Sequence, residues 1–414
     1  MVRDDKDDSL LMRENLVQIR RAVGRDLTQE QLGVDLATIS LDGLVQPTAA
    51  ATPSDIIVYF LSSLYVGTDI VGQVISADAY TAFDEEKDKA LKQAVQIVDS
   101  AVILTGVVIT SLRPEHRKHD RNLYTQVLGP LLSHLPPLRP LPKVLPRTFP
   151  DAVAEMRVAR YPMDRIGSAD FEQFQLHILA SDPQPLAIPA LALNWPALAD
   201  GHWNSPGFWA ELTCGGHRLV PAERGRSYTD SEWSVALVPF AEILAQMLAL
   251  PGALPQAAEI CYMAQYNLAD QFPELALGVL TPDFCHAFYD DDEDSSAAGG
   301  PIMNVWLGPA GTVSPLHRDP AHNIYVQVVG RKYFRLYPKA TAVYADTAAT
   351  GTTTTSTVDL DDDTPENRRR YPNFDWDTGY HDIVLGPGDA VFIPRGWWHY
   401  VRSLSPSIGV NFWF

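Results

Sequence analysis

Apolar residues recur at helical spacing through the first third of the chain. Leu128, Leu131, Leu132 and Leu135 follow one another every three or four residues, which places them on one face of a helix. The hydroxyl of Ser54 can cap the start of another helix. The pattern predicts helices over residues 11–23, 54–65, 84–112 and 121–135.

One of these segments has to be distinguished from a membrane span. The 19 residues from Ala94 to Leu112 are mostly apolar, but they include Gln96, Asp99 and Ser100. A charge inside a lone spanning helix costs free energy because lipid cannot solvate it. We therefore expect this segment to be the buried core helix of a bundle, and we expect no membrane partner.

The residue pattern of the sequence changes at a run of prolines. Proline stands at positions 136, 137, 140, 142, 146 and 150. Because proline has a fixed φ and no backbone N–H, this density excludes helix and sheet and predicts a stiff, extended connector. We predict a helical region over 1–135, a proline-rich linker over 136–160 and a second domain over 161–414.

The second domain has the pattern of a β protein. Short β-rich runs alternate with Gly/Pro turns, which is typical of a barrel or sandwich. The runs are 185–193, 219–222, 303–307, 324–329, 333–337, 382–385, 390–393 and 407–412. Two low-complexity insertions, Asp290–Gly300 and Thr347–Asp363, are expected to be solvated loops.

The charge balance limits the possible partners. The chain of 414 residues has 32 Lys and Arg against 51 Asp and Glu, a net charge of −19. Such a chain is a poor general binder of polyanions, so direct nucleic-acid binding is not expected. An acidic surface suits basic protein partners, although it also serves solubility alone. Three cysteines without metal-binding spacing indicate free thiols in a reducing compartment.

Metal-binding chemistry is indicated by the sequence His317-Arg318-Asp319. In a strand, residues two apart project from the same face, so the imidazole and the carboxylate point together. A third ligand must come from elsewhere, and His399, at the end of GPGDAVFIPRGWWH, is the candidate. Two histidines and one carboxylate form the facial triad of non-haem Fe(II) oxygenases. The His-x-Asp pattern alone is common, and a surface pair is its ordinary explanation.

Lys332 adds a second requirement. Gly330-Arg331 is a plausible hairpin turn, after which Lys332, Phe334 and Leu336 share one face of a strand. A lysine among core residues is costly to bury unless it meets an anion, and a dicarboxylate would supply one. The alternative is a lysine at the strand end whose ammonium reaches water.

Together these motifs resemble the JmjC domain of 2-oxoglutarate oxygenases over about residues 161–414. The resemblance lies in LHRDP at 316–320, Asn323, QVVGRK at 327–332 and the GPGDAVFIPRGWWHYV segment. It implies an α+β protein with a C-terminal double-stranded β-helix, a cupin-like jelly roll, behind an N-terminal α-helical region. It also implies cofactor Fe(II), cosubstrate 2-oxoglutarate and O₂.

The resemblance also implies roles for individual residues. It makes His317, Asp319 and His399 the catalytic iron ligands. It implies that the cosubstrate is bound by Lys332, Tyr262, Ser314, Asn323 and Trp306. It assigns a substrate arginine to Glu223 and Trp233, with Gln265 and Trp413 completing the pocket. Chemically, a carboxylate and an aromatic face both attract a guanidinium.

The expected activity is hydroxylation of a protein side chain, most of all an arginine of a basic protein or peptide of histone or ribosomal type. N-methyl-lysine demethylation of histones is the alternative, because oxidation of an N-methyl carbon ends in loss of formaldehyde. A non-catalytic chromatin- or protein-binding module, a cupin isomerase and a protease are further readings, with the protease last. The resemblance implies a location in the nucleus or the cytoplasm.

Overall fold

The computed structural model describes residues 14–23, 25–26, 52–76, 85–112, 114–133, 138, 141–151, 153, 157–229, 232–249, 259–287, 300–345 and 354–414. The chain forms two compact units. The first comprises Met1–Lys143, Ala210–Pro221 and Leu237–Glu242, and the second comprises Val144–Trp209, Ala222–Ala236 and Ile243–Phe414. The sequence did not predict that Ala210–Pro221 and Leu237–Glu242 belong to the first unit. The division into a helical region, a proline-rich linker and a second domain remains a prediction.

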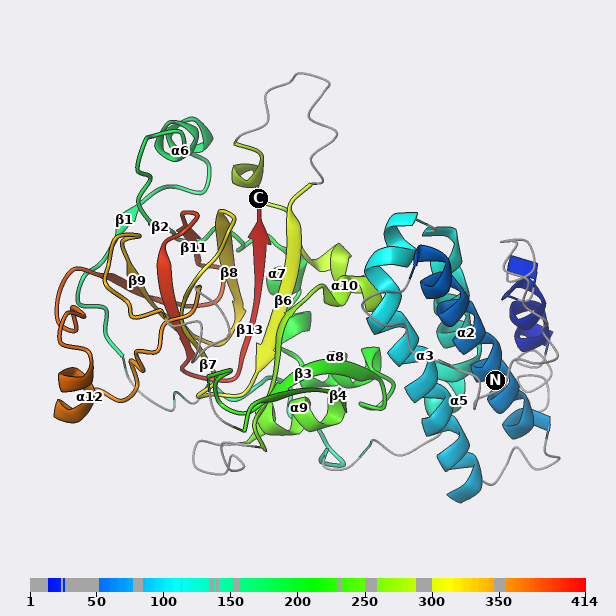
Figure 1. The fold of residues 1–414 in the computed structure, drawn as a ribbon. Helices are drawn as coiled ribbons and strands as arrows, with labels where there is room; N and C mark the ends of the chain where they lie inside the picture. The colour runs from blue at the N-terminus through cyan, green and yellow to red at the C-terminus, as the bar shows by residue number, and fades with distance from the viewer. Residues whose placement is uncertain are drawn as a thin grey trace. The chain divides into compact units, whose positions relative to one another are not determined.

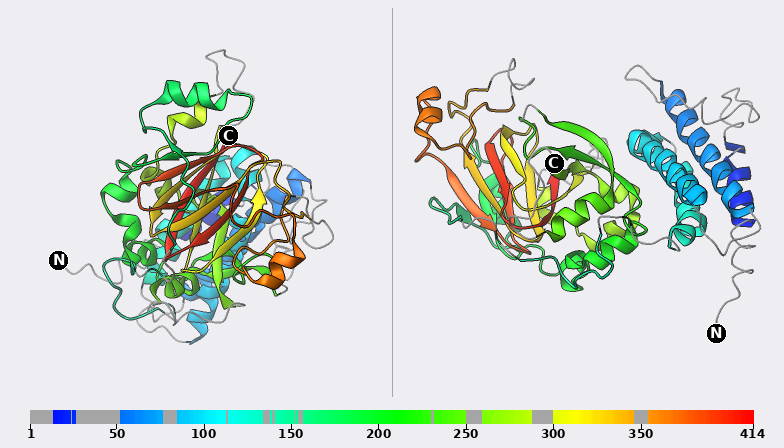
Figure 2. Two further views of the ribbon diagram at one scale, coloured as in Figure 1. Left: turned by 90° about the vertical axis from the view of Figure 1, so that its left-hand side faces the viewer. Right: turned by 90° about the horizontal axis from the view of Figure 1, so that it is seen from below.

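The first unit is a helical bundle. Residues 14–23 are helical, and α2 (Pro53–Ser76) and α3 (Glu85–Leu112) pack along each other (Figure 2). After them come α4 (Arg117–Leu123), a π-helical turn (Tyr124–Leu128) and α5 (Gly129–Ser133). The predicted helices are confirmed where the structure describes them. The second is longer than expected, and the fourth is divided by the π turn.

Small and apolar residues allow the close contact of α2 with α3. The buried side chains of Phe60, Leu64, Leu91 and Val98 belong to one hydrophobic core. A Cβ added at Gly67 would lie 2.8 Å from the Val98 side chain, so only glycine fits there without displacement of a neighbour.

The charge that argued against a membrane span in α3 is buried and paired. Asp99 is 0% exposed, and its Oδ1 lies 2.8 Å from Nη2 of Arg218. The Arg218 guanidinium also lies 3.3 Å from the ring centre of Tyr124. Among the described helices, the one long and apolar enough to cross a membrane is α2, over Ile56–Ile75, and 61% of that stretch is buried within the protein.

The second unit contains two β-sheets whose side chains meet in a common core. The larger sheet has the order β1-β2-β11-β8-β13-β6-β5-β3-β4, and Figure 1 shows β8, β13 and β6 side by side in it. The smaller has the order β10-β9-β12-β7. Tyr325 and Val391 from the larger sheet pack with Phe334, Leu336 and Leu385 from the smaller. The predicted α+β class with a C-terminal cupin-like jelly roll is confirmed.

The strands are β1 (Asp164–Arg165), β2 (Leu186–Ile188), β3 (Leu219–Arg224), β4 (Ser234–Pro239), β5 (Cys261–Tyr266), β6 (Ile302–Gly308), β7 (Val313–Arg318), β8 (Asn323–Val329), β9 (Lys332–Tyr337), β10 (His381–Leu385), β11 (Ala390–Ile393), β12 (Trp398–Ser403) and β13 (Ser407–Trp413). The further helices are α6 (Phe171–Ile178), α7 (Pro196–Ala199), α8 (Pro206–Leu212), α9 (Phe240–Leu248), α10 (Leu268–Gln271) and α12 (Pro365–Arg370). Of the strands, β1, β4, β5, β7 and β12 lie outside the predicted runs, although the His317-Arg318 end of β7 was expected to be extended.

The turn at Gly330-Arg331 joins β8 to β9, but the two strands lie in different sheets and do not pair with each other, so the predicted hairpin is wrong. Gly330 has φ +75°, and a Cβ there would lie 1.9 Å from the Pro406 carbonyl oxygen. Only glycine can therefore occupy this turn. Lys332 follows this turn as the first residue of β9 and is 1% exposed, and the register of the strand is set by its pairing with β10 and β12.

The second low-complexity insertion is not a solvated loop where it is described. Val358 and Leu360 are buried against aromatic residues of the smaller sheet, and Thr355 pairs with His317 as an isolated β-bridge. Asp361 accepts hydrogen bonds from Arg157 and Tyr400 at 3.0 and 2.6 Å. The prediction was wrong because this low-complexity stretch includes the core residues Val358 and Leu360 and the buried, ion-paired Asp361. Residues 347–353, and 290–299 of the acidic insertion, lie outside the described residues.

Replacing Asp99 by Ala should lower the free energy of unfolding by about 3–5 kcal/mol, because Arg218 would remain buried without its carboxylate. Urea unfolding of the full chain measures this loss. The double variant Asp99→Leu with Arg218→Met should recover most of it, since a buried ion pair is replaceable by apolar side chains of similar size. A loss below about 1 kcal/mol for the single variant would contradict the importance of the pair.

Candidate metal centre

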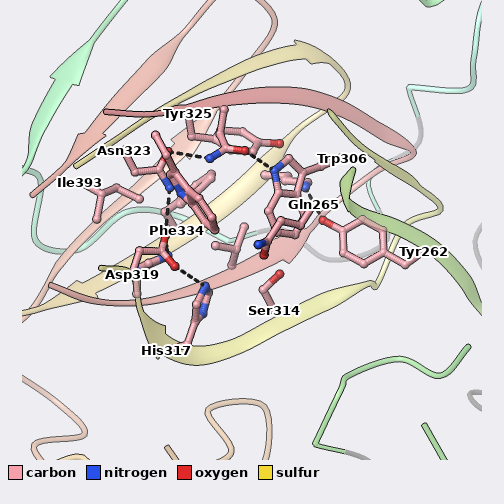
Figure 3. A pocket seen from close by; sticks show the side chains of 15 residues that line it. Tyr262, Gln265, Trp306, Ser314, His317, Asp319, Asn323, Tyr325, Phe334 and Ile393 are labelled. Carbon is pink, nitrogen blue, oxygen red and sulfur yellow. Dashed lines mark hydrogen bonds and ion pairs between the residues drawn. The ribbon is translucent and has the colours of Figure 1, made fainter. Parts of the chain in front are cut away.

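Three side chains that sequence analysis proposed as ligands converge where β7 and β12 pair. His317 lies near the end of β7 and Asp319 follows that strand (Figure 3). His399 of β12 lies directly opposite His317 in the antiparallel register. The two imidazole centres are 4.1 Å apart. Asp319 Oδ2 lies 3.5 Å from His399 Nε2, and Asp319 Oδ1 lies 4.0 Å from His317 Nε2. The donor atoms all fall within 4.8 Å of one another.

The hydrogen bonds of the two histidines suit metal binding. His317 Nδ1 lies 2.7 Å from the Pro315 carbonyl oxygen, and His399 Nδ1 lies 3.1 Å from that of Trp397. A carbonyl only accepts, so each Nδ1 carries the proton and each Nε2 presents a lone pair to the shared space. Burial lowers the pKa of His399 to about 4, and the adjacent His317 contributes to the shift. Two neutral imidazoles and one carboxylate on one face fit a divalent ion such as Fe(II).

A chain of hydrogen bonds fixes the third ligand. The Trp306 indole donates to Asn411 Oδ1 at 2.7 Å, and Asn411 Nδ2 donates to Asn323 Oδ1 at 3.1 Å. Asn323 Nδ2 then donates to Asp319 Oδ2 at 3.3 Å. Because an indole can only donate, the sequence of donors and acceptors has one direction and sets both amide orientations. The carboxylate is therefore oriented from outside the metal site.

Lys332 lies deep in the same cavity. Its Nζ donates to the Tyr262 hydroxyl at 2.9 Å and lies 5.1–5.8 Å from the ring centres of Tyr262, Trp306 and Tyr325. Burial lowers the pKa of Lys332 to about 7, and in the described part of the chain no carboxylate offsets that loss of water. Burial likewise raises the pKa of Tyr262, so its hydroxyl keeps its proton. This arrangement can accept a small anion.

The ligand triad and Lys332 line one cavity, whose empty volume is about 390 Å³ when the part open to solvent is included. The predicted residues Tyr262, Gln265, Trp306, Ser314, Asn323 and Trp413 line it as well (Figure 3). Gln265 has φ +49° and lies at a register shift of β5 between Met263 and Tyr266. A bulge of this kind re-aims a side chain, which brings Gln265 to the cavity wall.

Glu223 and Trp233 are not part of that lining. Glu223 lies on β3 opposite Tyr262 of β5 in the strand register, so it is one strand away from the cavity wall. Burial raises the pKa of Glu223, and the neighbouring Trp233 indole partly offsets this. The Glu223 charge also raises the pKa values of Tyr228 and Tyr262, which places the carboxylate close to both phenols.

Several residues of the site were not predicted from the sequence. Tyr228 meets His317 edge-on at 6.3 Å between ring centres, and its hydroxyl lies 3.5 Å from that of Thr355. Tyr325 and Asn411 line the cavity. Strand alternation could have found these two, because Tyr325 is two residues from Asn323 and Asn411 is two residues from Trp413. No local pattern marks Tyr228.

His322 is close in sequence but belongs to a different environment. Its Nδ1 accepts a hydrogen bond from the Arg395 backbone at 3.2 Å, and its ring stacks on Phe392. His322 is absent from the residues that line the cavity.

Asn411→Ala should weaken divalent-metal binding about tenfold or more, because Asn323 loses the partner that orients it toward Asp319. Calorimetric titration with Mn²⁺ measures the change. Asn304→Ala is the matched control, since Asn304 is a buried amide opposite Asn411 on β6 and outside the hydrogen-bond chain. Equal losses in both variants would mean that the effect is general destabilisation.

Comparison with known proteins agrees with this geometry. Residues 171–414 match the family described as "Cupin-like domain". The chain is 35% identical over 244 residues to "Lysine-specific demethylase 8" of Xenopus tropicalis, covering 59% of this chain and 50% of that protein. It is 37% identical over 236 residues to "Lysine-specific demethylase JMJ30" of Arabidopsis thaliana, covering 56% and 49%. It is 33% identical over 261 residues to "Jumonji C domain-containing protein 5" of Drosophila melanogaster, covering 60% and 59%.

The chain spans about half the length of the first two of these relatives. The family match includes the ligand triad, Lys332 and every other residue that lines the cavity. The chain therefore belongs to the cupin-like domain family, as a member with a JmjC domain.

Proposed function

We propose that this protein is an Fe(II)- and 2-oxoglutarate-dependent oxygenase that hydroxylates an arginine side chain of a basic protein. The observation that carries the proposal is that three convergent metal donors and a buried ammonium line the same cavity. A metal site alone needs no buried lysine. The pairing of the two favours a cosubstrate that binds metal at one end and carries a carboxylate at the other.

In the proposed site, His317, Asp319 and His399 hold the ferrous ion. Ferrous iron and 2-oxoglutarate, when bound, activate O₂ for oxidation of a C–H bond. Lys332 binds the distal carboxylate of 2-oxoglutarate, and the hydroxyls of Tyr262 and Ser314 donate to the same group. Asn323 keeps Asp319 oriented, and Trp306 forms the wall that excludes water from the cavity.

The neighbourhood of Glu223 supports an arginine substrate. A half-buried carboxylate beside an indole attracts a guanidinium through charge, hydrogen bonds and the aromatic face. Tyr228 meets His317 edge-on and feels the charge of Glu223, so it can guide an extended side chain from Glu223 toward the metal. The net charge of −19 favours approach of a basic protein.

Demethylation of N-methyl-lysine is the second candidate. It is favoured by the names of two relatives, which are called lysine-specific demethylases. The same iron chemistry serves both reactions, and the outcome depends on which carbon is held near the metal.

Mass spectrometry of a basic peptide library distinguishes the two. Incubation with Fe(II), 2-oxoglutarate and O₂ should add one oxygen to arginine-containing peptides and form succinate. Loss of a methyl group from methyl-lysine peptides instead would decide for demethylation. His399→Ala should abolish both products, and turnover that persists in this variant would refute the metal assignment.

Glu223→Gln should reduce kcat/KM for an arginine peptide about tenfold or more while leaving the KM for 2-oxoglutarate unchanged, because it removes the charge that faces the guanidinium. Glu242→Gln is the control for loss of a carboxylate elsewhere. An unchanged kcat/KM in Glu223→Gln would remove the basis of the arginine assignment.

Lys332→Met should abolish measurable 2-oxoglutarate binding, since it keeps an apolar side chain but loses the ammonium. Burial places the pKa of Lys332 at about 7 without an anion, so the binding form is the protonated one below that pH. From pH 7 to 9 binding must take up a proton, and affinity should fall by up to about tenfold per pH unit. Calorimetry on the Mn²⁺-loaded protein measures both effects.

Lys332→Arg is the matched control, because a guanidinium stays charged over this range. Residual binding by this variant should show a flatter pH profile. The same slope in the wild type and in Lys332→Arg would assign the pH dependence to another group.

A further inference from the structure

The helical unit contains a second cluster of metal donors. Asp26, His116 and His119 bring one ligand atom each within 4.8 Å of the others. Asp26 lies just after the helical residues 14–23, and the two histidines lie three residues apart where the 3₁₀ turn Pro114–His116 leads into α4. This spacing puts both imidazoles on one face of the helix.

The two imidazoles are buried, and one carboxylate oxygen serves both. His116 is 4% exposed and His119 is 3% exposed. Asp26 Oδ2 lies 3.1 Å from His116 Nδ1 and 2.5 Å from His119 Nε2. The rings are 6.1 Å apart and nearly parallel, so their nitrogens face the same oxygen from two sides.

The charged residues next to the two histidines in sequence pair with each other. Arg117 and Asp120, which stand between and beside the histidines in sequence, form a buried ion pair at 3.4 Å. The cluster therefore consists of one carboxylate and two imidazoles. Neutral imidazoles with a carboxylate are a donor set that Zn²⁺ prefers.

We propose that Asp26, His116 and His119 bind a zinc ion, with water as a fourth ligand, and so tie residues 14–26 to α4. In a tetrahedral zinc site the donors lie about 3.3 Å apart. The Asp26–His116 separation already fits. The Asp26–His119 contact is a direct hydrogen bond that a rotation of the carboxylate opens, and the Asp26 side chain has the room because it is 21% exposed.

Zinc binding at this cluster can be measured on its own when the metal site of the JmjC cavity is removed by mutation. The starting protein is the full chain with His317→Ala and Asp319→Ala, which removes two of the three donors of the triad. After dialysis against micromolar zinc, elemental analysis should find one equivalent of zinc bound. Its thermal midpoint should rise by several degrees when zinc is added, because zinc binds the folded unit.

Two further changes test the donors. Adding His119→Asn should remove the zinc equivalent, and adding Asp26→Asn should weaken the affinity at least tenfold. Asp26 is 21% exposed and Asn is nearly isosteric with Asp, so circular dichroism should show an intact fold for Asp26→Asn even where a histidine variant is destabilised. His286→Asn, an exposed histidine of the second unit, should leave zinc binding unchanged.

Absence of bound zinc in the triad-deficient protein, or retention of it in folded Asp26→Asn with wild-type affinity, would overturn the proposal. The cluster would then be a hydrogen-bonded carboxylate and imidazole group. Neither result touches the oxygenase proposal, because that is tested by turnover in a protein whose triad is intact.

Discussion

The antiparallel pairing of β12 with β7 is the constraint on which the metal site depends. Directly opposed residues of such a pair stand side by side on one face of the sheet, so the register that sets His399 against His317 also sets two imidazoles side by side. A shift of one residue would turn His399 to the other face. The register shift beyond His399 is confined to the step before Val401, so it leaves the histidine pair undisturbed.

The same small sheet also carries the buried ammonium. Lys332 of β9 is paired with Ser403 of β12, four residues beyond His399, which places their backbones about 13 Å apart along the strand. The long lysine side chain covers part of that distance, and in the proposed function a small diacid covers the rest. One sheet thus determines both ends of the cosubstrate site, while β8, β6 and β13 of the other sheet supply the polar wall and the aromatic wall.

Residues whose signal is local were predictable from the sequence. The shared orientation of His317 and Asp319 follows from alternation of side chains along one strand, and the burial of Lys332 follows from alternation along another. The turn at Gly330 follows from the need for a positive φ. Alternation along β13 also points to Asn411, but its hydrogen bond to Asn323 depends on the pairing of β13 with β8, which no short pattern encodes. Gln265 reaches the cavity through a bulge, and the distance of Glu223 from the lining depends on how β3 joins β5. These relations arise between strands distant in sequence, so they become visible only in three dimensions.

The structure of the low-complexity insertion Thr347–Asp363, where it is described, also depends on contacts with segments distant in sequence. Its threonines and aspartates resemble solvated sequence, yet Asp361 lies among Arg157, Arg226 and Arg402, which come from three separate segments. The apolar residues Val358 and Leu360 then cover the outer face of the smaller sheet.

That insertion also closes an edge. In the order β10-β9-β12-β7, the strand that carries His317 would be left with a free side, but the Arg318 N–H donates to Thr354 and the Ser356 N–H donates to the Leu316 carbonyl, at 2.9 and 2.8 Å. A covered edge offers no template for another chain to add a strand. A chain that approached this edge would first have to displace Thr354 and Ser356, so the strand beside the metal is shielded from aggregation through its backbone.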